Sequence, residues 1–161
     1  MPVQSYHGKK CQFVGYEYQS NAILVQALRD QTDNSLQEAF EDVYFYLASK
    51  GFKPKFNIMD YQCSRRIQKY ITSQGTDIQL VNPDDHRINA AERAIQTWKN
   101  HYVAGLSTTD HNCPLQLCCQ FIAQAQDTLN MLRRFRVNPK LSSYAVLEGQ
   151  FNFNIFPSVL H

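Results

Sequence analysis

Two acidic residues stand at positions where carboxylates could bind a divalent metal ion. Asp60 follows a segment with the composition of a β-strand, and Glu92 lies about two turns into the helix predicted after the next strand, with 31 residues between them. Ligands bind at the carboxyl edge of open α/β sheets, so these carboxylates can converge on metal. Two-metal phosphoryl chemistry needs several such oxygens around ions about 4 Å apart. The spacing also fits two unrelated surface carboxylates, which is the usual situation for Asp and Glu.

The elements that must position these residues follow from periodicity and turn signals. Aromatic and β-branched runs predict strands, apolar residues at steps of three and four predict helices, and Gly, Asn and Pro mark the turns. The predicted order is strands 11–18 and 22–28, a helix from Asp33 or Asn34 to Gly51, strand 52–59, helix 64–75, strand 77–81, and helices 85–101 and 115–134. Strands that alternate with helices indicate an α/β fold whose mixed sheet has a parallel last part.

Length and composition are those of one folded domain. The chain has 161 residues, 43% of them hydrophobic, and a formal net charge of +2. We expect a single domain over residues 1–161, with an irregular C-terminal extension over about 135–161. No apolar run approaches the roughly 18 residues of a membrane span, and the start does not resemble a signal peptide. An intracellular protein with reduced cysteines is therefore expected, and the cysteine spacing does not predict a zinc site.

Charged residues are unevenly distributed along the chain. Residues 30–42 carry acidic side chains and no Lys or Arg, whereas basic residues gather in segments 50–69 and 133–140. Such an arrangement suits a protein that meets phosphate on one side, although solvated surface faces explain clusters this short equally well.

The run HRINAAERAIQTWKNH (86–101), which contains Glu92, resembles the integrase of long-terminal-repeat retrotransposons. The segments YQSNAILVQAL (18–28), AGLSTTD (104–110) and LNMLRRFRVNPKLSSYAVLEGQFNFN (129–154) are similar to the same family. The resemblance covers nearly the whole chain, and the helix that carries Glu92 is its most specific part. It implies an RNase H-like fold and metal-dependent insertion of element DNA into a target.

The resemblance also assigns residues. Asp60 matches the second catalytic acid of the family and Glu92 the third, and both would hold Mg²⁺ or Mn²⁺ at low occupancy. The helix face along the DNA end would carry Lys99 as the first choice for a phosphate contact. Further DNA-contact candidates are Gln96, Arg93 and Arg87. Trp98 is expected in the core instead, because a single aromatic residue on an amphipathic helix usually faces inward.

The family's first catalytic acid, an Asp on the central strand, has no counterpart before Asp30. Glu17 is the only earlier acid, and it reaches the site only if the strand alignment is wrong. Residues 2–10 resemble the end of that central strand and its turn. We therefore expect a truncated or degenerate integrase core with little activity alone.

Two other classes of function remain open. The chain could be a non-catalytic module for nucleic-acid binding or oligomerisation, with segments 50–69 and 133–140 as its basic surface. It could also be a nuclease or RNase H-type hydrolase, which needs the same carboxylates. DNA and integrase subunits, including copies of this chain, are the expected partners. A functional protein would act in the nucleus.

Overall fold

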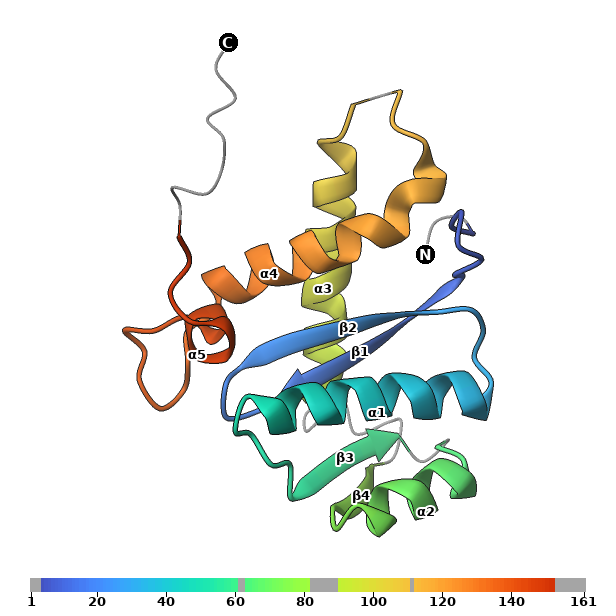
Figure 1. Cartoon of the computed structure of the whole chain (residues 1–161), viewed down its shortest axis with the longest axis vertical. Helices are drawn as coiled ribbons and strands as arrows, with labels where there is room; N and C mark the ends of the chain where they lie inside the picture. Colours follow the sequence, from blue (N-terminus) through green and yellow to red (C-terminus); the bar gives the residue numbers. More distant parts are fainter. Residues whose placement is uncertain (1–3, 61–62, 82–89, 111, 153–161) are drawn as a thin grey trace.

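A computed structural model describes residues 4–60, 63–81, 90–110 and 112–152. Strands and helices alternate along the chain, which confirms the predicted mixed α/β class (Figure 1). The elements are β1 (Cys11–Glu17), β2 (Ala22–Leu28), α1 (Asp33–Ser49), β3 (Phe56–Asp60), α2 (Arg65–Ser73), β4 (Asp77–Val81), α3 (Ala90–Ser107), the 3₁₀ helix η1 (Leu115–Gln120), α4 (Phe121–Leu132) and α5 (Ser143–Glu148).

β1 and β2 form an antiparallel hairpin in which Cys11 pairs with Leu28 and Glu17 with Ala22. The tight turn between them has Asn21 in the left-handed conformation (φ 61°), which Asn adopts at lower cost than most residues. The strand boundaries agree with the sequence prediction to within one residue. The turn signal at residues 19–21 therefore sets the register of the hairpin.

β3 and β4 form a parallel pair in which Phe56 lies opposite Asp77 and Asp60 opposite Val81. Among the described residues this pair and the hairpin are separate two-stranded sheets. The prediction that β3 begins at Phe52 was wrong, because the strand begins at Phe56. Pro54 lies in the intervening stretch and has no backbone N–H to donate to a neighbouring strand.

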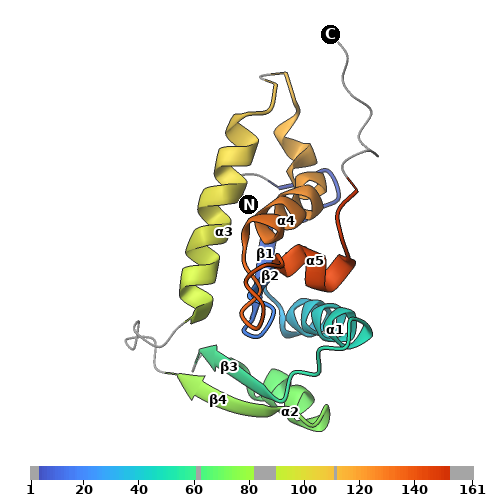
Figure 2. The same ribbon diagram turned by 90° about the vertical axis from the view of Figure 1, so that its left-hand side faces the viewer.

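Helices cover both faces of the hairpin. Ile23 and Val25 of β2 belong to a buried cluster with Trp98 of α3 and Leu129 of α4. The alternate β2 residues pack on the other face with Leu47 of α1 and Leu147 of α5. Figure 2 shows α3 and α1 on opposite sides of the hairpin, with β3, β4 and α2 at one end. Burial on two faces explains why the start of β2 is a continuous apolar run.

The ends of the helices show where local sequence signals suffice. Ser64 caps α2, as predicted, by accepting a hydrogen bond from the Ile67 N–H. The cap of α1 is Thr32 and not the predicted Asp33 or Asn34. Helix α3 continues past the predicted end at His101 to Ser107, and Leu106 packs against the larger buried cluster.

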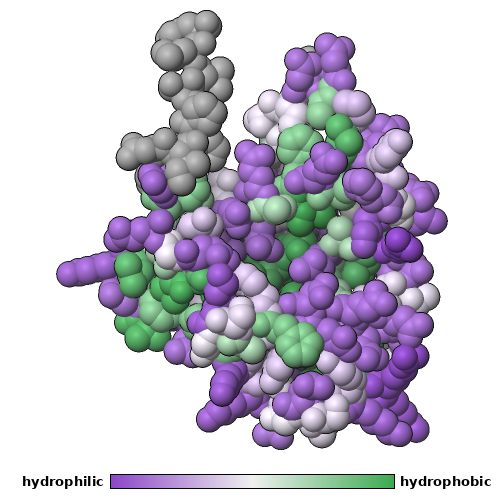
Figure 3. Space-filling view, viewed as in Figure 1, coloured by the Kyte–Doolittle hydropathy of each residue, from purple (hydrophilic) through white to green (hydrophobic). Residues whose placement is uncertain are grey.

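The C-terminal third is more regular than the sequence suggested. The predicted helix 115–134 is divided into η1 and α4, and the segment expected to be irregular contains α5. Lys50 Nζ forms an ion pair with Glu148 Oε2 (2.7 Å), which joins α5 to the C-terminal end of α1. Figure 3 shows apolar side chains over α5 and the loop before it, where Val137 and Leu141 are exposed. No described helix combines the length and apolar character needed to cross a membrane.

Candidate functional site

Asp60 is the last residue of β3 and lies opposite Val81, the last residue of β4. The two strands are parallel, so the backbone of Asp60 is at their shared carboxyl edge, as the sequence predicted. Ligands of α/β sheets commonly bind at this edge. The side chain of Asp60 lies outside the part of the chain that the structure describes.

Glu92 lies in the first turn of α3 and its side chain is exposed. The arrowheads of β3 and β4 point towards the N-terminal end of α3 in Figure 2. The C-terminal end of β3, which carries Asp60, and the N-terminal end of α3, which carries Glu92, therefore lie at the same end of the molecule. The partial positive charge of a helix N-terminus also favours a carboxylate such as that of Glu92.

The two faces of α3 have different roles. Ala94, Trp98 and Tyr102 are buried, and the Trp98 and Tyr102 rings stack with centroids 5.1 Å apart. Trp98 is fully buried and its Nε1 donates to Gln12 Oε1 of β1 (2.8 Å). This confirms the prediction that Trp98 is a core residue. Anchoring α3 through Trp98 fixes which residues face outward.

The opposite face of α3 presents the predicted DNA-contact residues. Gln96 and Lys99 follow Glu92 by four and seven residues, and all three side chains are exposed. Arg93 is exposed as well, whereas Arg87 lies outside the described residues. Gln96 Nε2 donates to Asn100 Oδ1 (3.1 Å), which orients the amide along the helix. An anionic ligand that lies along the exposed face of α3 could contact the side chains of Arg93, Gln96 and Lys99.

Within the described ranges, no group of three or more His, Cys, Asp or Glu side chains is arranged to hold a metal ion. Asp60 and Glu92 supply hard carboxylate oxygens, the donor type that Mg²⁺ prefers. Two carboxylates fit one ion that keeps several of its waters. They are fewer ligands than a pair of ions requires.

The two basic segments, residues 50–69 and 133–140, differ in how many of their charged side chains are exposed and able to contact a ligand. In the first, Lys53, Lys55, Arg65, Arg66 and Lys69 are all exposed. Arg65 and Arg66 occupy the first turn of α2, where positive charge is unfavourable because the helix dipole is also positive there. Helix stability therefore does not explain their position, which suits a surface that meets anions.

In the second segment, two arginines serve internal contacts. Arg133 donates through Nε to Asn21 O (2.6 Å) and through an Nη atom to Asn21 Oδ1 (2.6 Å). The Arg136 guanidinium lies 4.0 Å from the ring centroid of Tyr18 and donates to the Tyr16 hydroxyl. Arg134 is exposed. The segment thus joins the end of α4 to the hairpin turn, a role that its charge pattern did not reveal.

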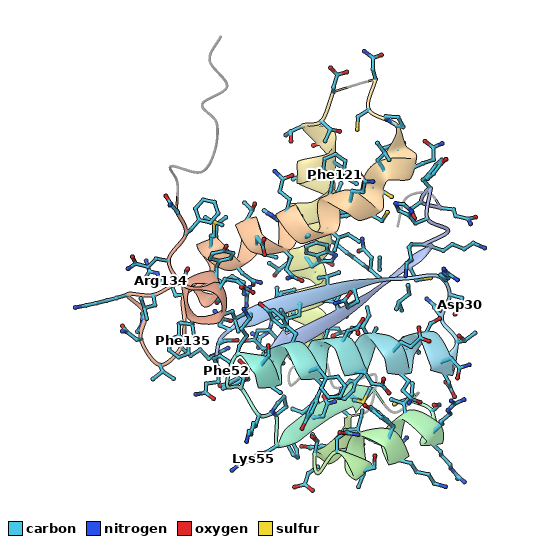
Figure 4. The ribbon with its side chains drawn as sticks, in the orientation of Figure 1. Asp30, Phe52, Lys55, Phe121, Arg134 and Phe135 are labelled. Atoms are coloured by element: carbon cyan, nitrogen blue, oxygen red, sulfur yellow. The ribbon has the colours of Figure 1, made fainter. Side chains whose placement is uncertain are left out.

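A polar cavity of about 550 Å³ lies at the opposite end of α1 from Arg134. Its acidic lining residues include Asp30, Glu38 and Asp42. Figure 4 shows Asp30 at this end and Arg134 and Phe135 at the other. Hydrogen bonds from the Thr32 and Ser35 side chains lower the pKa of Asp30 to about 2. Glu92 is not among the described residues that line this cavity, so the cavity is separate from the start of α3.

Comparisons with known proteins identify the fold. No family model and no curated protein sequence matches the chain. The catalytic core domain of HTLV-2 integrase, solved with magnesium in a dimeric form, aligns with a TM-score of 0.61 at 21% identity, over 86% of this chain and 83% of that one. Its trimeric form gives 0.61 at 22% identity, over 86% and 84%. A chain of the simian T-cell lymphotropic virus intasome in complex with PP2A regulatory subunit B56 gamma gives 0.67 at 14%, over 98% and 55%.

These similarities confirm the predicted fold class, the RNase H-like α/β arrangement of integrase catalytic cores. At such low sequence identity they establish the fold and leave the activity to be argued from the residues. The solved structures that match in fold are retroviral integrases, whereas the sequence segments resemble the integrases of retrotransposons.

Proposed function

We propose that the chain is an integrase core domain of the long-terminal-repeat retrotransposon kind, which acts on DNA with a divalent cation. The observation that carries this proposal is the position of Asp60 at the carboxyl edge of β3 and Glu92 at the start of α3, within an integrase-like fold. The HTLV-2 cores of the same fold were solved with magnesium. Such a domain would meet its target DNA in the nucleus.

In this proposal Asp60 and Glu92 bind Mg²⁺ or Mn²⁺ weakly. A bound ion would stabilise charge that develops on phosphate during cleavage and transfer of a DNA strand. The exposed row of Gln96 and Lys99, with Arg93 beside it, would contact the phosphate backbone and orient the DNA end along α3. Two carboxylates neutralise a pair of ions poorly, so we expect little strand transfer from this chain alone.

Titration of the chain with Mg²⁺ and Mn²⁺, monitored by chemical shifts, tests the metal site. We expect saturable shifts at Asp60 and Glu92, which Asp60→Asn and Glu92→Gln each abolish. Glu38→Gln, a change at an exposed acid on α1, is the matched control and should leave the shifts intact. Shifts that survive both substitutions would refute the assignment. Robust strand transfer that depends on Asp60 would refute only the expectation of low activity.

A second candidate function is non-catalytic binding of nucleic acid through segment 50–69. The exposed Arg65 and Arg66 in the first turn of α2 favour it. Affinity for duplex DNA should then fall steeply with salt, and Arg65→Ala with Arg66→Ala should reduce the slope of log K against log salt by about 2. Asp60→Asn should have no effect on this binding, whereas Lys99→Ala should weaken DNA binding only if the α3 row is used.

A further inference from the structure

The turn between β1 and β2 and the segment that follows α4 hold each other in place. The Tyr16 hydroxyl donates to Asn21 Oδ1 (2.9 Å) and accepts a hydrogen bond from an Nη atom of Arg136 (2.7 Å). Asn21 Nδ2 in turn donates to the carbonyl of Arg134 (2.9 Å). Together with the two bonds from Arg133 to Asn21, these contacts fix the loop on the turn. The backbone of the loop and the Arg136 guanidinium are therefore positioned before any ligand binds.

Tyr18 lies at the start of this turn and presents its ring to solvent. The Arg136 guanidinium lies 4.0 Å from the Tyr18 ring centroid, and the Tyr16 and Tyr18 rings make an edge-to-face contact with centroids 6.4 Å apart. Tyr18 is nevertheless 65% exposed. Its ring is thus oriented by two neighbours and keeps open surface on which a further planar group can stack.

The same surface carries positive charge that no carboxylate among the described residues neutralises. Arg134, Arg136 and Lys140 are exposed, and none of them forms an ion pair within the described ranges. Glu17 of the hairpin accepts from the N–H groups of residues 19 and 20, so the turn holds its carboxylate. An open aromatic ring beside several cations fits a ligand that has both planar and anionic groups.

This surface lies away from the edge of the parallel strands, where Asp60 ends β3. In Figure 1 the arrowhead of β3 points away from the side of the molecule that carries the loop between α4 and α5. Figure 4 places Arg134 on the side of this loop. The surface is therefore separate from the candidate metal site.

We propose that Tyr18, Arg134, Arg136 and Lys140 form a binding surface for single-stranded nucleic acid, in which an unpaired base stacks on the pair of Tyr18 and Arg136. Bases stack on aromatic rings and guanidinium planes, and the flanking Arg134 and Lys140 contact phosphates. A duplex keeps its bases paired and stacked, so it offers this surface mainly phosphates. An acidic peptide offers charge without a planar base. The site needs no metal ion and is independent of the proposed function and of segment 50–69.

The test compares two end-labelled probes by fluorescence anisotropy without divalent metal: an oligothymidylate of about 15 nucleotides and an abasic deoxyribose-phosphate strand of the same length. The two probes carry equal charge, so the ratio of their Kd values isolates base stacking. We expect the oligothymidylate to bind about tenfold more tightly than the abasic strand. Tyr18→Ala should abolish this preference, whereas Tyr18→Phe, which keeps the aromatic ring, should preserve it.

Two further variants separate stacking from charge. Tyr6→Ala is the matched control, because Tyr6 is 80% exposed and its ring contacts His7, and it should leave both Kd values unchanged. Arg134→Ala should weaken both probes, reduce the slope of log K against log salt by about 0.7, and keep their ratio. Equal affinity for the two probes, or a preference that survives Tyr18→Ala, would overturn the site. Polyglutamate that competes as well as unlabelled oligothymidylate would identify a surface for acidic peptides instead.

Discussion

Asn130 of α4 replaces a neighbouring strand for Ile23 of β2. Its Oδ1 accepts from the Ile23 N–H (3.0 Å) and its Nδ2 donates to the Ile23 carbonyl (2.9 Å), and both residues are buried. One amide thus satisfies both backbone groups that the outer edge of β2 exposes at this position. Satisfying them closes this edge to pairing with another chain.

Asn130→Ala should therefore destabilise the domain strongly. It leaves a buried N–H and a buried carbonyl without partners, at a cost of about 2–4 kcal/mol in the free energy of unfolding. Gln124→Ala, on the exposed side of the same helix, is the matched control and should cost less than about 0.5 kcal/mol. Urea denaturation of the two variants measures the difference. Similar midpoints would show that water satisfies the edge.

The hydrogen bond from Trp98 to Gln12 predicts a coupling between the two residues. The Trp98 indole N–H donates to Gln12 Oε1, so the two residues form a hydrogen bond between α3 and β1. Trp98→Phe should lower the free energy of unfolding by about 1–3 kcal/mol, because it removes the indole donor from Gln12 Oε1 and leaves a small cavity. Gln12→Leu should lower the free energy of unfolding by less than Trp98→Phe does. The double variant should recover about 0.5–1.5 kcal/mol relative to the sum, and strict additivity in a double-mutant cycle would contradict the coupling.

The two adjacent arginines after α4 should behave differently. Arg133→Ala removes two charge-assisted hydrogen bonds to Asn21 and should lower the free energy of unfolding by about 1.5–3 kcal/mol. Arg134 has an exposed side chain, so Arg134→Ala should change stability by less than about 0.5 kcal/mol. If duplex DNA binds here, Arg134→Ala should weaken binding without destabilising the fold. Equal thermal denaturation of the two variants would argue against the internal role of Arg133.

The hydrogen bonds to the Asp30 carboxylate predict that the free energy of unfolding depends on pH. Its carboxylate accepts from Thr32 Oγ1 (2.6 Å) and Ser35 Oγ (2.7 Å), and these bonds lower its pKa from 3.8 to about 2. The folded-state pKa is below the unfolded one, so the stabilisation is present above pH 3.8 and is lost as the pH falls through about 2. Asp30→Asn should therefore be less stable than the wild type near neutral pH, with a difference that shrinks over this range. A difference that stays constant in denaturation experiments would contradict the linkage, and carboxyl chemical shifts measure the pKa directly.

Elements fixed by local signals were predictable from the sequence. The hairpin follows from a turn at residues 19–21 between two β-rich runs, and α2 from Ser64 as a cap with Gly75 beyond its end. Helices and strands that depend on contacts with residues far away in the chain were not predictable from local signals. Ser142 caps α5 and Gly149 follows its end, but a helix this short also depends on the packing of Leu147 near α1 and on the ion pair of Glu148 with Lys50, contacts that no local pattern encodes.

The positions of the strand and the helix that carry the candidate residues were predictable to the same extent. The end of β3 at Asp60 and the inward face of α3 at Trp98 follow from strand and helix periodicity. The internal role of Arg133 did not follow, because it depends on a hairpin turn more than a hundred residues earlier, at Asn21. The pairing of Asp60 with Glu92 around a metal ion stays a prediction.

The separation of 107 residues between Ile23 and Asn130 has a consequence for synthesis of the chain. A ribosome completes the hairpin long before it reaches α4, and the outer edge of β2 lacks its amide partners throughout that interval. The N-terminal strands are therefore most prone to pair with other nascent chains early in translation, and the last major helix ends that period. A chain that is stopped before residue 130 keeps the edge of a β-sheet permanently open.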